Sequence, residues 1–269
     1  MKLLNFKSKF VIFLFAVFCF NGYLSAQDMG TEKAELVTDR PDQTESATIV
    51  PVGSVQLETG LLYSSDKTEV AGIKYGISSF SIPNNLFRIG LIKPVELRVM
   101  AGEFSSSRFN VGDISTAGPK GLSAIALGTK IKFWDEKGFI PETAILAHVT
   151  LPVGGKDVRP AEPIYDFRFS LAHTLSDNLA LGYNIGGEYD PFLDEFSGLY
   201  TLSLGIGLTD SFGVFGEFFG DFDSSHEFDA GLTYLISDMV QYDLSGGFGL
   251  TADAPDFFIS TGITVRLFN

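Results

Sequence analysis

The sequence predicts an all-β fold, an up-and-down antiparallel transmembrane β-barrel of about 12 strands. Three observations predict it. Apolar and polar residues alternate with a period of two from residue 54 to the end of the chain. Many of the alternating stretches run for about ten residues, the length of a tilted bilayer crossing, whereas ordinary strands have about five or six. Short and long connections alternate between them, which is typical of bacterial outer-membrane barrels.

Residues 1–26 predict a secretory signal peptide. Three lysines and no acid lie before residue 10, an apolar run follows over residues 10–20, and the stretch ends in Leu24-Ser25-Ala26. The apolar run is shorter than the roughly 20 residues that a spanning helix needs, and an uncleaved anchor is the alternative. The only cysteine, Cys19, would leave with this segment, so the mature chain would carry no disulfide.

The charge balance of the chain is acidic. It has 19 basic and 33 acidic residues, and removal of residues 1–26 would move the formal net charge from −14 to −17. This argues against a nucleic-acid partner, because phosphate binding requires a basic face. Three histidines and no remaining cysteine argue against zinc. We therefore expect neither a metal nor a cofactor.

Residues 27–53 predict an irregular, water-facing periplasmic segment ahead of the sheet. Residues 38–46 of this segment form a specific string of residues that a strand does not require. We interpret this string as the motif of a plug that docks in the barrel. Arg40 would enter the periplasmic mouth and pair with inward carboxylates, while Pro41 stiffens the approach. The alternatives are a solvated leader and a calcium site. The plug motif comprises Asp39, Arg40, Pro41, Asp42 and Glu45.

Residues 54–269 predict the barrel itself. In the first stretch, apolar residues from Val55 to Tyr63 alternate with Gln56, Glu58 and Gly60. The same pattern recurs over residues 87–91, 95–101, 125–133, 143–151, 165–171, 179–185, 200–206, 212–221, 228–234, 242–248 and 259–267. Five short turns and six longer connections, among them residues 64–79 and 104–121, would join twelve strands with both ends in the periplasm.

A soluble β-sandwich is the competing fold. It would bury its inner faces and leave the polar faces in water. The strand length argues against it, and so do the unlike charges at the polar positions of nearly every strand, which a hydrated lumen can hold.

Charged residues at the inward positions fall into two groups. The basic group lies on the second to sixth strands, the acidic group on the ninth to eleventh, and Glu96 and Arg266 also face inward. Across a closed barrel the two groups would set up a transverse field that selects solutes by charge. The alternative is that the charges pair and fill a narrow pore. The groups are Arg88, Arg98, Lys130, Lys132 and Arg168, and Glu217, Asp221, Glu227, Asp229 and Asp243.

Two stretches resemble a known family. They are Thr38-Asp39-Arg40-Pro41-Asp42-Gln43-Thr44-Glu45-Ser46, followed by Val50 to Gly60, and the hairpin from Leu86-Phe87-Arg88 to Val95-Glu96-Leu97-Arg98. The first stretch resembles the opening of the family described as Putative MetA-pathway of phenol degradation, and the hairpin is similar to the next hairpin of that family. Weaker likeness extends to Val265-Arg266-Leu267-Phe268. The resemblance implies a transporter-like outer-membrane barrel that takes up aromatic or other small hydrophobic compounds.

The function that we expect is that of an outer-membrane transporter or channel for small solutes, located in the outer membrane of a Gram-negative-type bacterium. A non-conducting structural or ligand-binding barrel is the alternative. We do not expect an enzyme, because the His148 and Thr150 pair lacks a serine and an orienting asparagine. The expected partners are outer-membrane lipid, a small-molecule solute and the barrel-insertion machinery. The oligomeric state stays open.

Overall fold

The computed structural model describes residues 34–267, so the predicted signal peptide and residues 27–33 lie outside the described residues. Fourteen strands form one sheet. They are β1 (Val55–Val70), β2 (Ile73–Ile92), β3 (Val95–Met100), β4 (Phe104–Val111), β5 (Ile114–Leu122), β6 (Ala126–Trp134), β7 (Glu142–Thr150), β8 (Ile164–Ser176), β9 (Leu179–Asp190), β10 (Glu195–Gly207), β11 (Phe212–Asp221), β12 (His226–Ser237), β13 (Val240–Gly249) and β14 (Phe257–Arg266).

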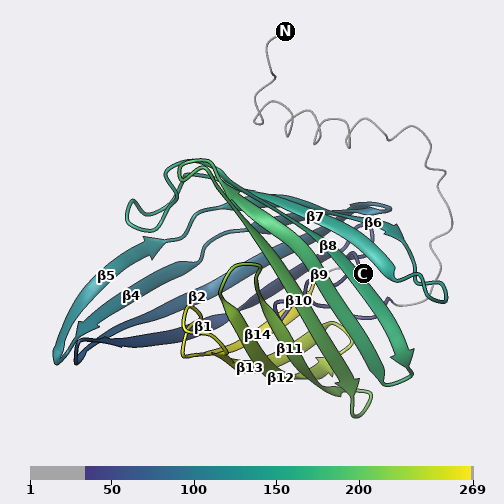
Figure 1. Cartoon of the computed structure of the whole chain (residues 1–269). Helices are drawn as coiled ribbons and strands as arrows, with labels where there is room; N and C mark the ends of the chain where they lie inside the picture. Colours follow the sequence, from purple (N-terminus) through teal and green to yellow (C-terminus); the bar gives the residue numbers. More distant parts are fainter. Residues whose placement is uncertain (1–33, 268–269) are drawn as a thin grey trace, which may run out of the picture. The chain divides into compact units, whose positions relative to one another are not determined.

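Twelve of these strands close into a ring. β1 pairs with both β14 and β2, β3 pairs with β2 and β6, and β6 to β14 follow in chain order, every pair antiparallel. The structure confirms the predicted 12-stranded up-and-down barrel (Figure 1). Closure pairs the backbone of every ring strand on both sides, which a strand crossing hydrocarbon requires. A sandwich of two sheets is therefore wrong.

The two faces of the ring have opposite polarity. On β10, Leu202, Leu204 and Ile206 point outward and are 45%, 40% and 40% exposed, whereas the inward Thr201 and Ser203 are 5% exposed. Apolar side chains also cover the outer faces of β9, β13 and β14. The buried centre holds ionised side chains, and the outer face is the apolar one, which is the polarity of a barrel in lipid.

The prediction of polar loops over residues 64–79 and 104–121 is wrong. β1 and β2 continue beyond the ring and end in a tight turn, where Ala71 and Gly72 both have positive φ, as a type I′ hairpin requires. β4 pairs with this extension of β2, and β5 pairs with β4 (Figure 1, left). Residues 73–77 of the extension alternate, but the phase changes at Ser78-Ser79, because Phe80 and Ile82 lie on the other face of the strand from Ile77.

Residues 34–53, called the docked segment below, run through the lumen without forming a strand. Val50 and Leu36 of the segment are buried, and on the lumen side Ala144 and Leu146 of β7 are fully buried. The described residues contain no helix long and apolar enough to cross a membrane.

Candidate functional site: a lumen occupied by an N-terminal segment

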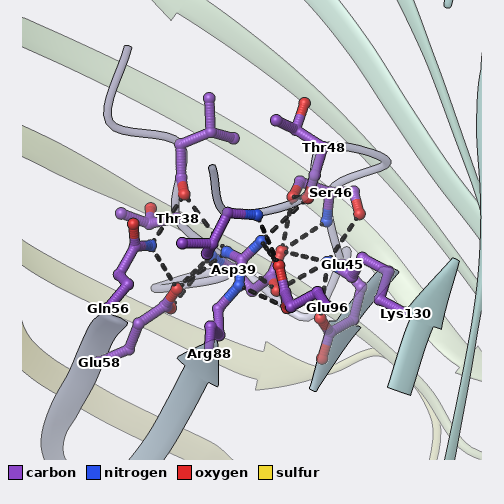
Figure 2. A network of polar contacts seen from close by, with 12 residues as sticks. Thr38, Asp39, Glu45, Ser46, Thr48, Gln56, Glu58, Arg88, Glu96 and Lys130 are labelled. Atoms are coloured by element: carbon purple, nitrogen blue, oxygen red, sulfur yellow. Dashed lines mark hydrogen bonds and ion pairs between the residues drawn. The ribbon is translucent and has the colours of Figure 1, made fainter. Parts of the chain in front are cut away.

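Asp39 of the docked segment lies at the centre of a buried polar network (Figure 2). Its carboxylate accepts hydrogen bonds from Lys130 Nζ at 2.8 Å and from Arg98, and Arg88 Nη1 lies 3.1 Å away. Its backbone nitrogen donates to Glu58 at 3.0 Å. Burial alone would raise the pKa of Asp39, but Arg88, Lys130 and Arg98 hold it well below its usual range.

The docked segment completes the charge balance of this wall of the lumen. Arg88, Arg98 and Lys130, called the cation cluster below, come from β2, β3 and β6 and are fully buried. The barrel supplies Glu58 and Glu96 to the cluster. The segment adds two further carboxylates, those of Asp39 and of Glu45, which lies 2.8 Å from Arg98. Buried charges are stable only when they are paired, so the segment supplies counter-charges that the strands alone lack.

Arg40 extends to the part of the wall formed by β13, β14 and β1. Its Nη2 lies 3.0 Å from Asp243 Oδ1 on β13 and donates to Ser260 on β14 at 3.0 Å. The guanidinium lies over Gly60 and Gly262, which are directly paired across β1 and β14. A Cβ at Gly60 would lie 2.6 Å from Arg40 Nη2, and a Cβ at Gly262 would lie 2.5 Å from Nε. The missing side chains therefore form the slot that Arg40 fills.

The acidic wall also binds the segment through Glu217 of β11. The Glu217 carboxylate accepts hydrogen bonds from the Gln43 nitrogen at 2.7 Å and from Thr44 Oγ1 at 2.5 Å. Thr44 Oγ1 also lies 2.6 Å from Thr201 Oγ1 on β10. Asp229 is paired directly with Glu217 across β11 and β12, and neither of its buried carboxylate oxygens has a hydrogen-bond donor among the described residues.

Backbone atoms of the segment are held as firmly as its side chains. Arg266 donates to the carbonyls of residues 34 and 35 at 2.8 and 3.0 Å, and Arg168 donates to the carbonyl of residue 43 at 3.0 Å. Glu96 accepts from the Val50 nitrogen at 2.8 Å. Asn184 both accepts from the Glu45 nitrogen and donates to its carbonyl. An irregular chain inside a protein needs such partners, because its backbone groups have no strand to pair with.

Most of the predicted lumen charges touch the docked segment. Those that do so are Arg88, Glu96, Arg98, Lys130, Arg168, Glu217, Asp243 and Arg266. Lys132 does not, because it pairs with Asp135 and with Glu142 at 2.6 Å. Asp229 has no contact with the segment through a hydrogen bond or ion pair.

The plug motif divides by role. Asp39, Arg40 and Glu45 make ion pairs with the barrel, Pro41 is buried beside them, and Asp42 lines a cavity described below. Burial, and then the charge of Glu217, raises the pKa of Asp42 well above its usual range. Among residues 34–267, no cluster of three or more potential ligands can hold a metal ion, so the calcium alternative is not supported.

Several contacts went unpredicted. Gln56, Glu58 and Asn184 bind the segment, and Gly60 and Gly262 make room for it. Alternation had placed Gln56, Glu58 and Asn184 on the polar face of their strands. Only the path of the segment, which alternation does not reveal, distinguishes them from other lumen residues.

His148 is held between two charged groups. Arg98 Nε donates to its Nε2 at 3.0 Å, and its Nδ1 lies 3.0 Å from Asp166 Oδ1. Both ring nitrogens therefore have partners in the lumen wall, as in a structural histidine.

Two cavities flank the docked segment on the side of β8 to β12. The outer cavity, about 320 Å³, is lined by residues including Gln43, Arg168, Glu188, Phe219 and Glu227, and it lies toward the longer connections. The inner cavity, about 430 Å³, is lined by residues including Arg40, Asp42, Asp177 and Phe215, and it lies toward the short turns. The contacts of Gln43 and Thr44 with Glu217 lie between the two.

The fold and the site define a class: a membrane-type β-barrel whose lumen is occupied by its own N-terminal segment. The family model described as Putative MetA-pathway of phenol degradation matches residues 38–267, and the chain belongs to this family. The match begins at Thr38, next to Asp39, so it includes the plug motif as well as the ring.

Solved structures are similar to this chain. An outer membrane channel from Pseudomonas putida F1 is similar at a TM-score of 0.59 and 12% identity, over 82% of this chain and 98% of that one. The translocator domain of the autotransporter NalP from Neisseria meningitidis has a TM-score of 0.49 and 10% sequence identity, over 81% of this chain and 90% of that one. The CymD monoaromatic hydrocarbon channel has a TM-score of 0.44 and 10% sequence identity, over 81% of this chain and 88% of that one. The sequence matches no curated protein.

Proposed function

We propose that this protein is an outer-membrane channel for small solutes whose lumen is closed by the docked segment and opens when part of that segment moves. The observation that carries the proposal is the position of residues 34–53, which bind Lys130 on β6 and, across the ring, Glu217 on β11, and which lie between the two cavities. The apolar outer face supports placement in a membrane. In this account the short turns face the periplasm, together with the start of β1.

The solute class follows from the family description, which connects the family with phenol degradation. We propose aromatic compounds of about the size of phenol. The inner face of β11 is consistent with this, because Phe215 and Phe219 line the inner and outer cavities, respectively.

The experiment is to compare the ion conductance of the mature chain in planar bilayers with that of a variant lacking residues 27–53. The deletion should raise the conductance, because it removes the chain that separates the cavities. Heat-modifiable migration on a gel verifies that the variant has folded. A folded variant that carries no current would contradict the proposal and favour a structural or ligand-binding barrel.

A further inference from the structure

Both cavities are lined by β8 to β12, and of these strands β11 carries a phenylalanine into each cavity. Along β11, Phe219, Glu217 and Phe215 point into the lumen in series, with an outward residue between each pair. Phe219 lines the outer cavity and Phe215 the inner one, and Glu217 lies between them. Phe215 lies over Gly231 of β12, where a Cβ would be 2.5 Å from its ring. The wall between the cavities thus presents an aromatic ring, a carboxylate and a second aromatic ring in succession.

The Glu217 carboxylate in this series accepts hydrogen bonds from groups of the docked segment that can move away from it. Glu217 accepts one hydrogen bond from a backbone nitrogen and one from the Thr44 hydroxyl, and it has no ion-pair partner among the described residues. On the other side of the lumen, Asp39 binds three buried cations. Three ion pairs hold Asp39, whereas Glu217 receives two hydrogen bonds from uncharged donors and Arg168 donates one to the carbonyl of residue 43. We therefore expect residues 43 and 44 to release before residue 39 does.

The charge along this route is negative. The outer cavity has Glu188, Asp221 and Glu227 against Arg168. The inner cavity has Glu35, Asp42 and Asp177 against Arg40. The cation cluster lines neither cavity, because its members are fully buried in ion pairs. A solute on this route therefore meets a field that repels anions.

We infer that the solute path follows the inner face of β11, and that it takes small aromatic molecules that are cationic or carry a neutral hydrogen-bond donor, and rejects aromatic carboxylates. This rests on the proposed channel function and specifies its solute. The ring of the solute packs against Phe219 and then Phe215. Its hydroxyl or ammonium group donates to Glu217 in place of the Gln43 nitrogen and the Thr44 hydroxyl. Residues 43 and 44 form the gate, while Asp39 keeps the rest of the segment in place.

Cysteine labelling in the full mature chain tests the path, because the chain has no cysteine after Cys19. Ser197→Cys reports on the outer cavity and Thr233→Cys on the inner one. A cationic thiosulfonate should label both positions faster than an anionic one of the same size, and phenol should slow the labelling while benzoate does not. Equal rates for the two reagents, or equal protection by benzoate, would overturn the inference.

Matched variants locate the binding groups. Glu217→Gln and Phe219→Leu should each weaken protection by phenol about tenfold, since a hydrogen bond to a charged group or an aromatic contact is lost. Asp166→Asn, an inward carboxylate that lines neither cavity, and Phe218→Leu, on the outer face of β11, should leave it unchanged. Equal losses in all four variants would overturn the path. Phenol protection without conductance after deletion of residues 27–53 would refute the channel instead.

Discussion

Asp39 is the residue on which docking depends most, because it is the counter-charge for three buried cations. Asp39→Asn keeps the shape of the side chain and removes its charge. Loss of one partner from a buried ionic network costs about 3–5 kcal/mol, here mostly in the free energy of docking. The variant should show faster proteolysis within residues 34–53 and a higher conductance.

The control for this variant is Glu35→Gln, which removes a carboxylate from an exposed position of the same segment. It should leave proteolysis within residues 34–53 as it is, and only proteolysis is compared because Glu35 lines the inner cavity. If both variants behaved like the unmodified chain, the ion pairs of Asp39 would have no role in holding the segment.

Gly262 gives a second prediction at this scale. In Gly262→Ala the new methyl group would lie 2.5 Å from Arg40 Nε and 2.5 Å from the Thr59 carbonyl, so Arg40 should leave its slot and lose Asp243. Overpacking of this kind costs about 1–3 kcal/mol. Gly205→Ala is the matched control, because nothing lies within 4 Å of the added Cβ. Equal thermal stability of the two variants would refute the slot.

The strength with which the docked segment binds the barrel should depend on pH. The pKa of Asp42 is raised in the docked state by burial and by Glu217, and it would return to its ordinary value after release. The docked form therefore binds the proton more tightly, and docking weakens as the pH rises through the docked-state pKa. Asp39 and Asp229 also face this group, and Ser203 hydrogen-bonds to it.

Conductance measured across a pH series checks this dependence. Conductance should increase toward alkaline pH, and Asp42→Asn should reduce the increase. The depressed pKa of Asp39 keeps its ion pairs intact until the solution is strongly acidic, so it does not oppose the trend near neutrality. A conductance that falls as the pH rises would contradict the role given to Asp42.

The β4–β5 hairpin is dispensable for closure of the ring. β3 pairs with β6 directly, and the hairpin pairs only with the extension of β2. A variant in which a short turn replaces residues 104–122 should therefore still form the barrel. Its migration on a gel should remain heat-modifiable, as for the unmodified chain. Loss of that shift would show that the hairpin supports the ring.

The ring could be predicted from sequence and the path of the segment could not, for a physical reason. Alternation reports which solvent each side chain meets, and from Val55 to Arg266 the ring strands meet lipid on one face and the lumen on the other. In the extension, the alternation of residues 73–77 changes phase at Ser78-Ser79, so it is not continuous with the alternation of residues 87–91. The pairing of Asp39 with the cation cluster depends on three-dimensional proximity between residues far apart in sequence.

At the scale of the whole molecule, the ring and the docked segment are one electrostatic unit. The strands alone bring two carboxylates, Glu58 and Glu96, to the cation cluster, and the segment brings Asp39 and Glu45 to the same cluster. Arg40 of the segment pairs with Asp243 on β13. The segment thus neutralises the basic group of inward charges, whereas Glu217 and Asp229 of the acidic group form no ion pair with it.

The most direct test of a lumen closed by its own N-terminal segment is a reversible lock. Thr44 and Thr201 have hydroxyl oxygens 2.6 Å apart, so the Thr44→Cys/Thr201→Cys double variant can form a disulfide that ties the segment to β10. Single-channel conductance would be recorded in planar bilayers before and after addition of a reductant, with each single variant as control. The account predicts a silent oxidised channel that conducts once reduced, and an oxidised form that conducts as well as the reduced one would contradict it.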